Sequence, residues 1–269
     1  MEIVLPYFTP RKWGVPFPFF STLAGAKQAG FDGVEIHLVG LSHAEARQAA
    51  ARARRLGLTV SVHQAWSVEE DGVRHIWNAA FDLLGWLPQG RDYPLAGHIP
   101  AGISAPAVIY ADRMHEPTDA DTWVQTCCHR DERGRFLVPF ERFLQDILNE
   151  RTPIVFDVQH VLEYACGVEG VASLPRRPQE LRDRLFAAWK IMRPLVKEIQ
   201  LADTDPSLGS SWGRNLPLNK GILPLREFCR MVKESGWDGR VVPEVQPMFY
   251  KFRRHSWAEL RRQTAKLFA

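Results

Sequence analysis

The stretch Phe156-Asp157-Val158-Gln159-His160 is a short apolar strand that ends on acid, amide and imidazole side chains. The same pattern recurs along the chain, with strand ends at Val62-His63, Gly97-His98, Tyr110-Ala111-Asp112, Gln200-Leu201-Ala202-Asp203 and Val242-Pro243-Glu244. Polar groups are costly to bury without partners, so their recurrence at strand ends indicates a site. In a closed parallel barrel these ends would meet around one pocket.

The segments between these strands have the pattern of amphipathic helices. Strands are expected at 2–7, 34–38, 58–63, 93–98, 106–112, 153–157, 198–203 and 240–245. Helices are expected at 21–29, 42–57, 67–84, 140–149, 178–196, 223–235 and after residue 256. Alternation of this kind implies parallel βαβ units, and eight strands favour a single (β/α)8 TIM barrel over residues 1–269. The helix between the fourth and fifth strands is missing or degenerate, and the connections 113–137 and 204–219 are expected to be lids or binding loops.

The composition of the 269 residues is that of a globular protein, with 45% hydrophobic and 24% charged residues. A net charge of +3 gives no nucleic-acid footprint. The four cysteines form no disulfide framework, and Cys127-Cys128-His129 lacks the second ligand pair of a structural zinc site. No signal-like or membrane-spanning apolar run is present, so we expect a cytoplasmic protein.

Three stretches together resemble the xylose isomerase-like barrel superfamily, which includes sugar isomerases and epimerases, inosose dehydratases and endonuclease IV. They are Gly30-Phe31-Asp32-Gly33-Val34-Glu35, Phe156-Asp157-Val158-Gln159-His160 and the segment 196–244. The last is similar to the family pattern of strand, His-x-x-Asp, loop, Gly, helix, Gly-x-x-Gly and strand ending in Glu. The resemblance covers nearly the whole chain in order.

The resemblance to the epimerase branch implies a divalent metal held by Glu, Asp, His and Glu from the ends of strands five to eight. Carried over, these positions are Asp112, Asp157, Gln200 and Glu244. An amide oxygen in place of an imidazole suits hard ions, so we expect Mn²⁺, Mg²⁺ or Co²⁺ rather than Zn²⁺.

The implied activity is isomerisation or epimerisation of a small polyhydroxylated carbonyl substrate, in which a proton moves beside a carbonyl. By resemblance, Asp112 and Glu244 form the acid/base pair, and His160 contacts substrate oxygens. The remaining candidates for substrate binding are His63 and His98 on the pocket wall, Glu35 with His37 at the end of the second strand, and Arg214 and Lys220 in the loop after the seventh strand. The two basic residues would suit a phosphate or carboxylate.

Two other functions stay open, and a third is not expected. A dehydratase acting on an inositol-type ketone would begin with the same enolisation. Gln200 favours a metal-free barrel that serves as a binding or accessory protein. The trinuclear zinc site of endonuclease IV is not expected to assemble, because Gln200 replaces its histidine and Gly213-Arg214-Asn215 replaces its Asp-Arg-His. Barrels of this superfamily are often homodimers or tetramers.

Overall fold

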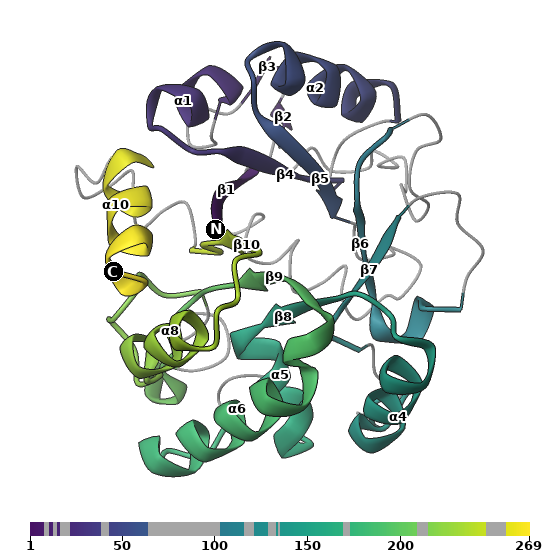
Figure 1. Ribbon diagram of the computed structural model, residues 1–269, viewed down its shortest axis with the longest axis vertical. Coiled ribbons are helices and arrows are strands. Elements are labelled where there is room, and N and C mark those ends of the chain that lie inside the picture. The colour runs from purple at the N-terminus through teal and green to yellow at the C-terminus, as the bar shows by residue number, and fades with distance from the viewer. Residues whose placement is uncertain are drawn as a thin grey trace.

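Eight parallel strands close into a barrel in which each strand is hydrogen-bonded to two neighbours (Figure 1). The strands are β1 (Glu2–Tyr7), β4 (Gly33–His37), β5 (Thr59–His63), β6 (Ala107–Tyr110), β7 (Thr122–Gln125), β8 (Ile154–Asp157), β9 (Val196–Gln200) and β10 (Arg240–Val242). Their order around the barrel is β1-β10-β9-β8-β7-β6-β5-β4. Two further short strands, β2 (Arg11–Lys12) and β3 (Val15–Pro16), pair antiparallel with each other. The predicted (β/α)8 barrel is therefore confirmed.

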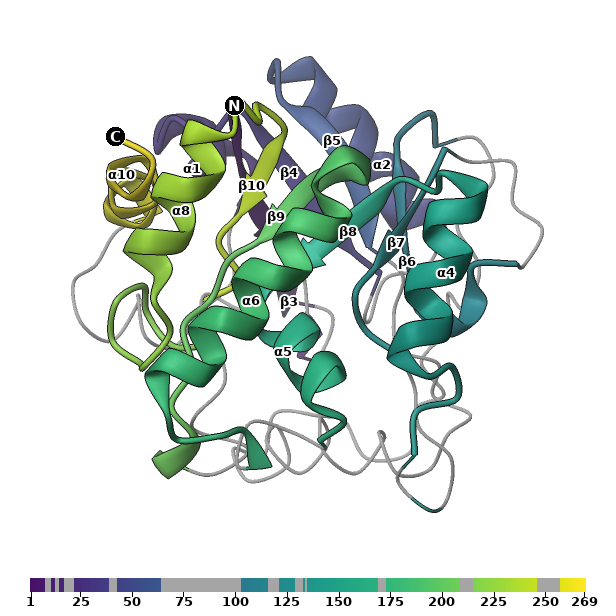
Figure 2. The same ribbon diagram turned by 60° about the horizontal axis from the view of Figure 1, so that its bottom comes forward.

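Helices surround this barrel. They are α1 (Leu23–Gln28), α2 (His43–Arg55), α4 (Phe140–Glu150), α5 (Val158–Cys166), α6 (Pro178–Met192), α8 (Leu225–Glu234) and α10 (Trp257–Leu267), with the 3-10 turns η1 (Ala111–Arg113), η3 (Arg193–Leu195) and η4 (Pro206–Leu208). Figure 2 shows α6 and α8 along the outside of the barrel and α5 near one of its ends. None of the helices within the described residues is both long and apolar enough to cross a membrane.

The computed structural model describes residues 1–7, 11–12, 15–16, 22–38, 43–63, 103–115, 121–128, 133, 135–168, 173–208, 215–245 and 257–269. The helix predicted at 67–84 and the strand predicted at 93–98 lie outside these residues. The predicted order of the strands is wrong at this point, because β5 pairs directly with β6 through Val62↔Ala107 and His63↔Val108. The strand predicted as the fifth is thus the fourth.

The fifth strand of the barrel is β7, which falls inside the segment 113–137 that was predicted to be a loop. Its four residues, Thr122-Trp123-Val124-Gln125, are too few to show the alternation of a longer strand. The helix expected to be missing would lie between the predicted strands at 93–98 and 106–112, a stretch that is largely outside the described residues. In the described part of the connection between β6 and β7, η1 is the regular element.

Close packing of β4 against β5 aligns the ends of these two strands. A Cβ atom on Gly33 would lie 2.1 Å from Oγ1 of Thr59 and 2.9 Å from its backbone oxygen, so glycine is required for this approach. The register that follows pairs Glu35 with Ser61 and His37 with His63. Two imidazoles are thereby placed side by side at the C-terminal ends of β4 and β5.

Candidate active site

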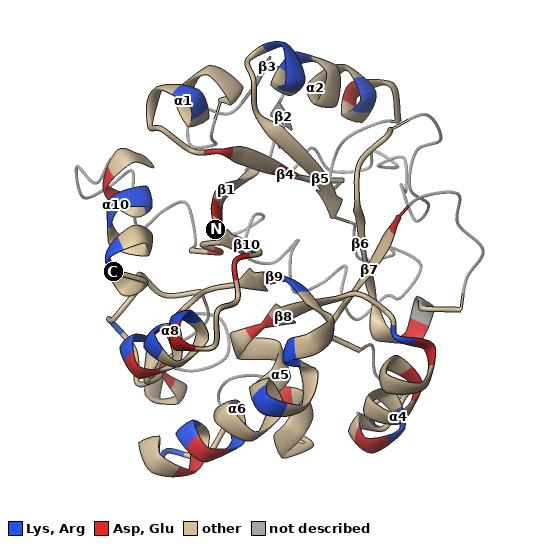
Figure 3. Cartoon of the chain, in the orientation of Figure 1, with Lys and Arg blue, Asp and Glu red and all other residues tan. Residues whose placement is uncertain are grey.

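Polar side chains occupy the C-terminal ends of the strands, as the sequence predicts. Lys and Arg lie mainly on the outer helices in Figure 3, whereas acidic residues are also found on β4 and β8. Glu35, Asp157 and Gln200 are each at most 4% exposed, although their side chains are polar or charged. Such groups are retained in a protein interior when they are paired with one another.

A chain of hydrogen bonds through two glutamines crosses the barrel. Nε2 of Gln125, at the end of β7, donates to Oε1 of Gln200 at 2.5 Å and to Oδ2 of Asp157 at 3.3 Å. Nε2 of Gln200 donates in turn to Oε1 of Glu35 at 3.2 Å. The chain links β7, β8 and β9 to β4 on the other side of the barrel. These hydrogen bonds fix the orientation of the amide groups of Gln125 and Gln200.

Asp157 is held in place by the helix that follows it. Its Oδ1 accepts hydrogen bonds from the backbone N–H groups of Gln159 at 2.8 Å and His160 at 3.0 Å, so Asp157 is the N-cap of α5. Its own backbone N–H donates to Oγ1 of Thr126 at 3.0 Å. Both carboxylate oxygens therefore accept hydrogen bonds, because Oδ2 is bonded to Gln125.

His160 follows Asp157 in the first turn of α5 and stands between two carboxylates. Its Nε2 lies 3.9 Å from Oδ2 of Asp157, and its Nδ1 lies 3.5 Å from Oε2 of Glu163. Burial opposes the charged imidazolium, but electrostatic interactions with Cys127 and Asp157 and a hydrogen bond with Glu163 raise the pKa of His160 well above its ordinary value. This setting favours the charged form of the imidazole, in which both ring nitrogens are hydrogen-bond donors.

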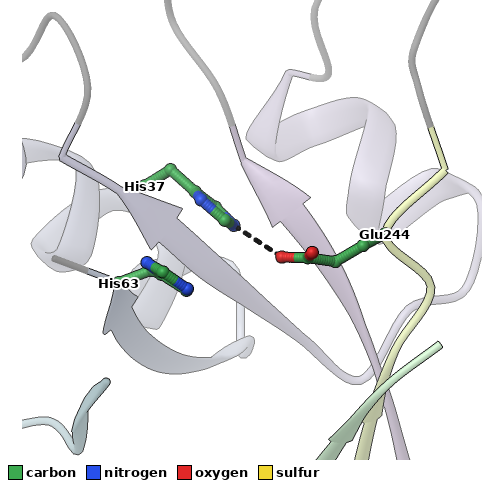
Figure 4. A group of neighbouring side chains, drawn as sticks. All are labelled: His37, His63 and Glu244. Carbon is green, nitrogen blue, oxygen red and sulfur yellow. Dashed lines mark ion pairs between the residues drawn. The ribbon is translucent and has the colours of Figure 1, made fainter. Parts of the chain in front are cut away.

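The side chains of His37, His63 and Glu244 gather at the ends of β4, β5 and β10 (Figure 4). The two imidazole rings are stacked, with centroids 4.5 Å apart and planes inclined by 10°. Nε2 of His37 lies 3.1 Å from Oε1 of Glu35 and 3.6 Å from Oε1 of Glu244. Burial lowers the pKa of His37 to about 3, so its ring is neutral at physiological pH.

Glu244 is tied to the loop that follows β9. Its carbonyl oxygen accepts a hydrogen bond from Nδ2 of Asn215 at 2.8 Å, and the backbone N–H of Asn215 donates to Oε1 of Gln159 at 3.2 Å. Burial, reinforced by the negative charges of Asp157 and Glu35, raises the pKa of Glu244 well above its ordinary value, and His160 partly offsets this effect. A raised pKa makes this carboxylate a stronger base than an ordinary glutamate.

The side chains of Glu35 and Glu198 form an acidic pair in the interior of the barrel. Glu35 and Glu198 are fully buried and close enough for their carboxyl groups to interact, and Nη1 of Arg240 lies 3.6 Å from Oε2 of Glu198. Burial raises the pKa of both carboxyl groups, and the charge of Glu35 adds to the effect on Glu198. Two carboxyl groups in contact are expected to share a proton.

The structure brings together six of the ten residues predicted for the site. They are Glu35, His63, Asp157, His160, Gln200 and Glu244. His98 and Arg214 lie outside the described residues. Lys220 is exposed and lies in a surface groove between α8 and α10, with Arg226 and Lys266.

Asp112 lies in a different environment from the other predicted metal ligands. It follows β6, which is opposite β10 in the barrel order. It acts electrostatically on Cys128 and Tyr164, and the Tyr164 ring packs against Phe140 and Phe143 of α4. Asp112 thus belongs to the region between the barrel and α4. The residue at the end of the fifth strand is Gln125.

The position that the resemblance implies for a metal therefore consists of Gln125, Asp157, Gln200 and Glu244. In this group Oε1 of Gln200 already accepts a hydrogen bond from Gln125, so the amide at the position of the implied histidine does not offer its oxygen to an ion. The donor set of His37, His63 and Glu244 does fit one, since two imidazole nitrogens and a carboxylate oxygen come within 4.8 Å of one another.

The sequence did not single out Gln125, Glu198 or Arg240. Gln125 ends the short run Thr122-Trp123-Val124 of β7, which was the available signal for a strand end. Glu198 and Arg240 begin their predicted strands, and charges at strand starts are ordinarily solvated. Here the barrel register pairs Glu198 with Arg240 and buries both.

Comparisons with known proteins agree with this architecture. The sequence of the chain matches the xylose isomerase-like TIM barrel family over residues 121–265. No curated protein matches the chain.

Solved structures share the fold at low sequence identity. D-psicose 3-epimerase from Clostridium cellulolyticum H10, solved with D-tagatose, is 12% identical with a TM-score of 0.51, covering 100% of this chain and 98% of its own. A xylose isomerase domain protein from Planctomyces limnophilus is 12% identical with a TM-score of 0.53, covering 98% of both chains. A family 2 AP endonuclease from Brucella melitensis is 13% identical with a TM-score of 0.52, covering 98% of this chain and 99% of its own.

These likenesses extend over the whole length of each chain, and at such identities they establish the fold. The sequence match covers more than half of the chain, from β7 to α10. The chain therefore belongs to the xylose isomerase-like TIM barrel family.

Proposed function

We propose that the protein is an isomerase or epimerase that moves a proton between carbon atoms beside the carbonyl group of a small polyhydroxylated substrate. The observation that carries the proposal is that Glu244, which follows β10 and is 14% exposed, interacts electrostatically with His160 in the first turn of α5. Sugar 3-epimerases among the proteins of like fold support the same class of reaction.

Glu244 is assigned the role of the base that removes the proton. One of its oxygens, Oε1, faces His37 at 3.6 Å, which leaves the other oxygen for proton transfer. The attachment of its backbone to Asn215 fixes the carboxylate relative to α5. A positioned base of this kind contributes about 10²- to 10⁴-fold to the rate.

His160 is assigned the role of the acid that faces the substrate oxygen on which charge builds. A cationic donor held by Asp157 and Glu163 stabilises an enediolate oxygen because it is already oriented before the reaction. This assignment replaces Asp112 as the partner of Glu244, because Asp112 lies beside Cys128 and Tyr164. A bound divalent ion would supply further stabilisation of the same oxygen.

The test is solvent exchange at the carbon beside the carbonyl. The purified protein is incubated in D₂O with a panel of ketoses and aldoses, in the presence of Mn²⁺, Co²⁺, Mg²⁺ or Zn²⁺, and proton signals are followed by NMR. We expect loss of one C–H signal and appearance of the isomer for at least one sugar. The variant Glu244→Gln is expected to lose this exchange and to keep its thermal stability; exchange that persists in this variant would remove Glu244 as the base.

A dehydratase is the second candidate, because His160 is also placed to protonate a leaving hydroxyl group after the same first step. An inositol-type ketone in the panel separates the two reactions. A dehydratase would release water and form an unsaturated ketone, whereas an isomerase would leave the molecular mass unchanged.

A further inference from the structure

The ring of polar groups contains two different places where an ion could be sought. One is the group of Gln125, Asp157, Gln200 and Glu244, which the relatives' pattern implies. The other is the group of His37, His63 and Glu244, which comes from the opposite side of the barrel. Glu244 is common to both, so the remaining residues decide between them.

In the first group, hydrogen bonds take the place of metal–ligand bonds. Oε1 of Gln200 accepts from Gln125 at 2.5 Å, and Nε2 of Gln200 donates to Glu35 at 3.2 Å. Both oxygens of Asp157 accept hydrogen bonds as well. A metal ion bound by the amide oxygen of Gln200 would have to break its hydrogen bond with Gln125, which is costly between buried groups.

In the second group, the strand register brings the two imidazoles together. His37 and His63 are register partners on adjacent parallel strands, so their side chains leave the sheet on the same face. Figure 4 shows both rings directed toward the carboxylate of Glu244. The three ligand atoms lie within 4.8 Å of one another, and an ion about 2.1 Å from each ligand would need them roughly 3–4 Å apart. Small side-chain rotations would close this difference.

We propose that His37, His63 and Glu244 bind one divalent transition-metal ion of the kind that prefers imidazole nitrogen, such as Zn²⁺, Fe²⁺ or Co²⁺. Three protein ligands leave coordination positions open, so the site can also receive oxygen atoms of a ligand. Oε1 of Glu35 lies 3.1 Å from Nε2 of His37, the nitrogen that also faces Glu244, and it accepts a hydrogen bond from Gln200, so a third carboxylate oxygen borders this place.

This assignment deepens the proposed function but does not depend on activity for its test. The sequence implied hard ions such as Mg²⁺ because the amide oxygen of Gln200 was taken as a ligand. Hard ions suit the two imidazole nitrogens of this site less well. The amide is engaged with Gln125 and Glu35.

The experiment is a titration of the chelator-treated full-length protein with Co²⁺, followed by the visible absorption of the ion, and with Zn²⁺, followed by calorimetry. We expect one ion per chain and Co²⁺ bands typical of nitrogen ligands. The variants His37→Ala and His63→Ala are each expected to lose at least about tenfold in affinity. The matched control is His43→Ala, which removes an exposed histidine from the start of α2 and should bind as the native chain does.

Asp157→Asn distinguishes the two groups. We expect it to keep its affinity for Co²⁺ within about threefold, because Asp157 is not a ligand in this proposal. A loss of binding in Asp157→Asn with full binding in the histidine variants would overturn the proposal, as would native protein that shows no Co²⁺ bands. His37→Gln, which preserves volume, replaces His37→Ala if circular dichroism shows that the alanine variant is unfolded.

The outcomes also separate this proposal from the proposed function. Ion binding without proton exchange on any sugar would support the metal site and contradict the proposed isomerase activity. Proton exchange that continues undiminished in chelator-treated protein, together with no Co²⁺ binding, would support the isomerase activity and contradict the metal site.

Discussion

Gln125 and Gln200 are joined by a 2.5 Å hydrogen bond between Nε2 and Oε1, although β8 lies between their strands. Together with the hydrogen bond from Gln125 to Asp157, this bond connects the fifth, sixth and seventh strands of the barrel. Neither amide can be removed without leaving a buried hydrogen-bond partner unpaired.

Replacement of Gln125 by Leu is expected to lower the free energy of unfolding by about 1–3 kcal/mol. The substitution leaves Oε1 of Gln200 and Oδ2 of Asp157 without their common donor in a buried setting. Urea denaturation measures the change. Gln179→Leu is the control, because Gln179 is exposed on α6 and its loss should cost less than about 0.5 kcal/mol. Equal stability of the two variants would contradict the structural role of the Gln125 amide.

Replacement of Glu198 by Gln is expected to change how stability depends on pH. Burial raises the pKa of Glu198 and of Glu35 in the folded chain, so the folded state holds more protons than the unfolded state above about pH 4.3. The contribution of this pair to stability is complete at lower pH and is lost as pH rises through the raised pKa values.

In Glu198→Gln one of these two acids no longer ionises. The difference in unfolding free energy between the variant and the native chain should therefore move in favour of the variant, by about 1 kcal/mol or more, between pH 5 and pH 8. Urea titrations at the two pH values measure it. Glu234→Gln, at an exposed position of α8, should show no such change. A shift in the opposite direction would mean that Arg240 keeps the pair ionised.

The sequence predicted the parts of the site that depend on local pattern. Asp157 and His160 were predicted because a run of apolar residues stops at them, and Glu244 because it follows the last strand. The helix α5 was not predicted, because Asp157-Val158-Gln159-His160 was interpreted as the end of a strand. In the structure Asp157 caps a helix that begins at Val158.

The parts that were not predicted depend on register and on side-chain contacts across the barrel. The order of the fourth and fifth strands required the position of β7, which has only four residues. The contacts between Gln125 and Gln200 and between His37 and Glu244 join residues on strands that are not adjacent. Such contacts follow from closure of the barrel and are not present in any local stretch of sequence.

Replacement of His160 by Gln is expected to lower kcat for proton exchange by about 10²-fold or more, with a smaller effect on KM. The glutamine can still form hydrogen bonds but carries no charge between Asp157 and Glu163. NMR exchange rates at several sugar concentrations give both constants. His115→Gln is the control, because His115 is 64% exposed and contacts Glu150 on the outer surface. An equal rise of KM with unchanged kcat would indicate that His160 only binds the substrate.

Replacement of Gly33 by Ala tests whether the approach of β4 to β5 holds the two histidines together. The new Cβ would meet Oγ1 of Thr59 at 2.1 Å and the backbone oxygen of Thr59 at 2.9 Å, so the strands must separate. We expect a loss of about 1–3 kcal/mol in unfolding free energy and a weaker affinity for Co²⁺, because His37 and His63 are register partners on these strands.

The double variant Gly33→Ala with Thr59→Ala removes the nearer of the two clashing atoms and leaves the backbone oxygen in place. It should therefore recover part of both losses, and the recovery of Co²⁺ affinity should follow the recovery of stability. Gly167→Ala is the control for the substitution itself, since no atom lies within 4 Å of its added Cβ and only the cost of its φ of 64° remains. If Gly33→Ala loses stability while its Co²⁺ affinity stays at the native value, the spacing of β4 and β5 does not set the distance between the imidazoles.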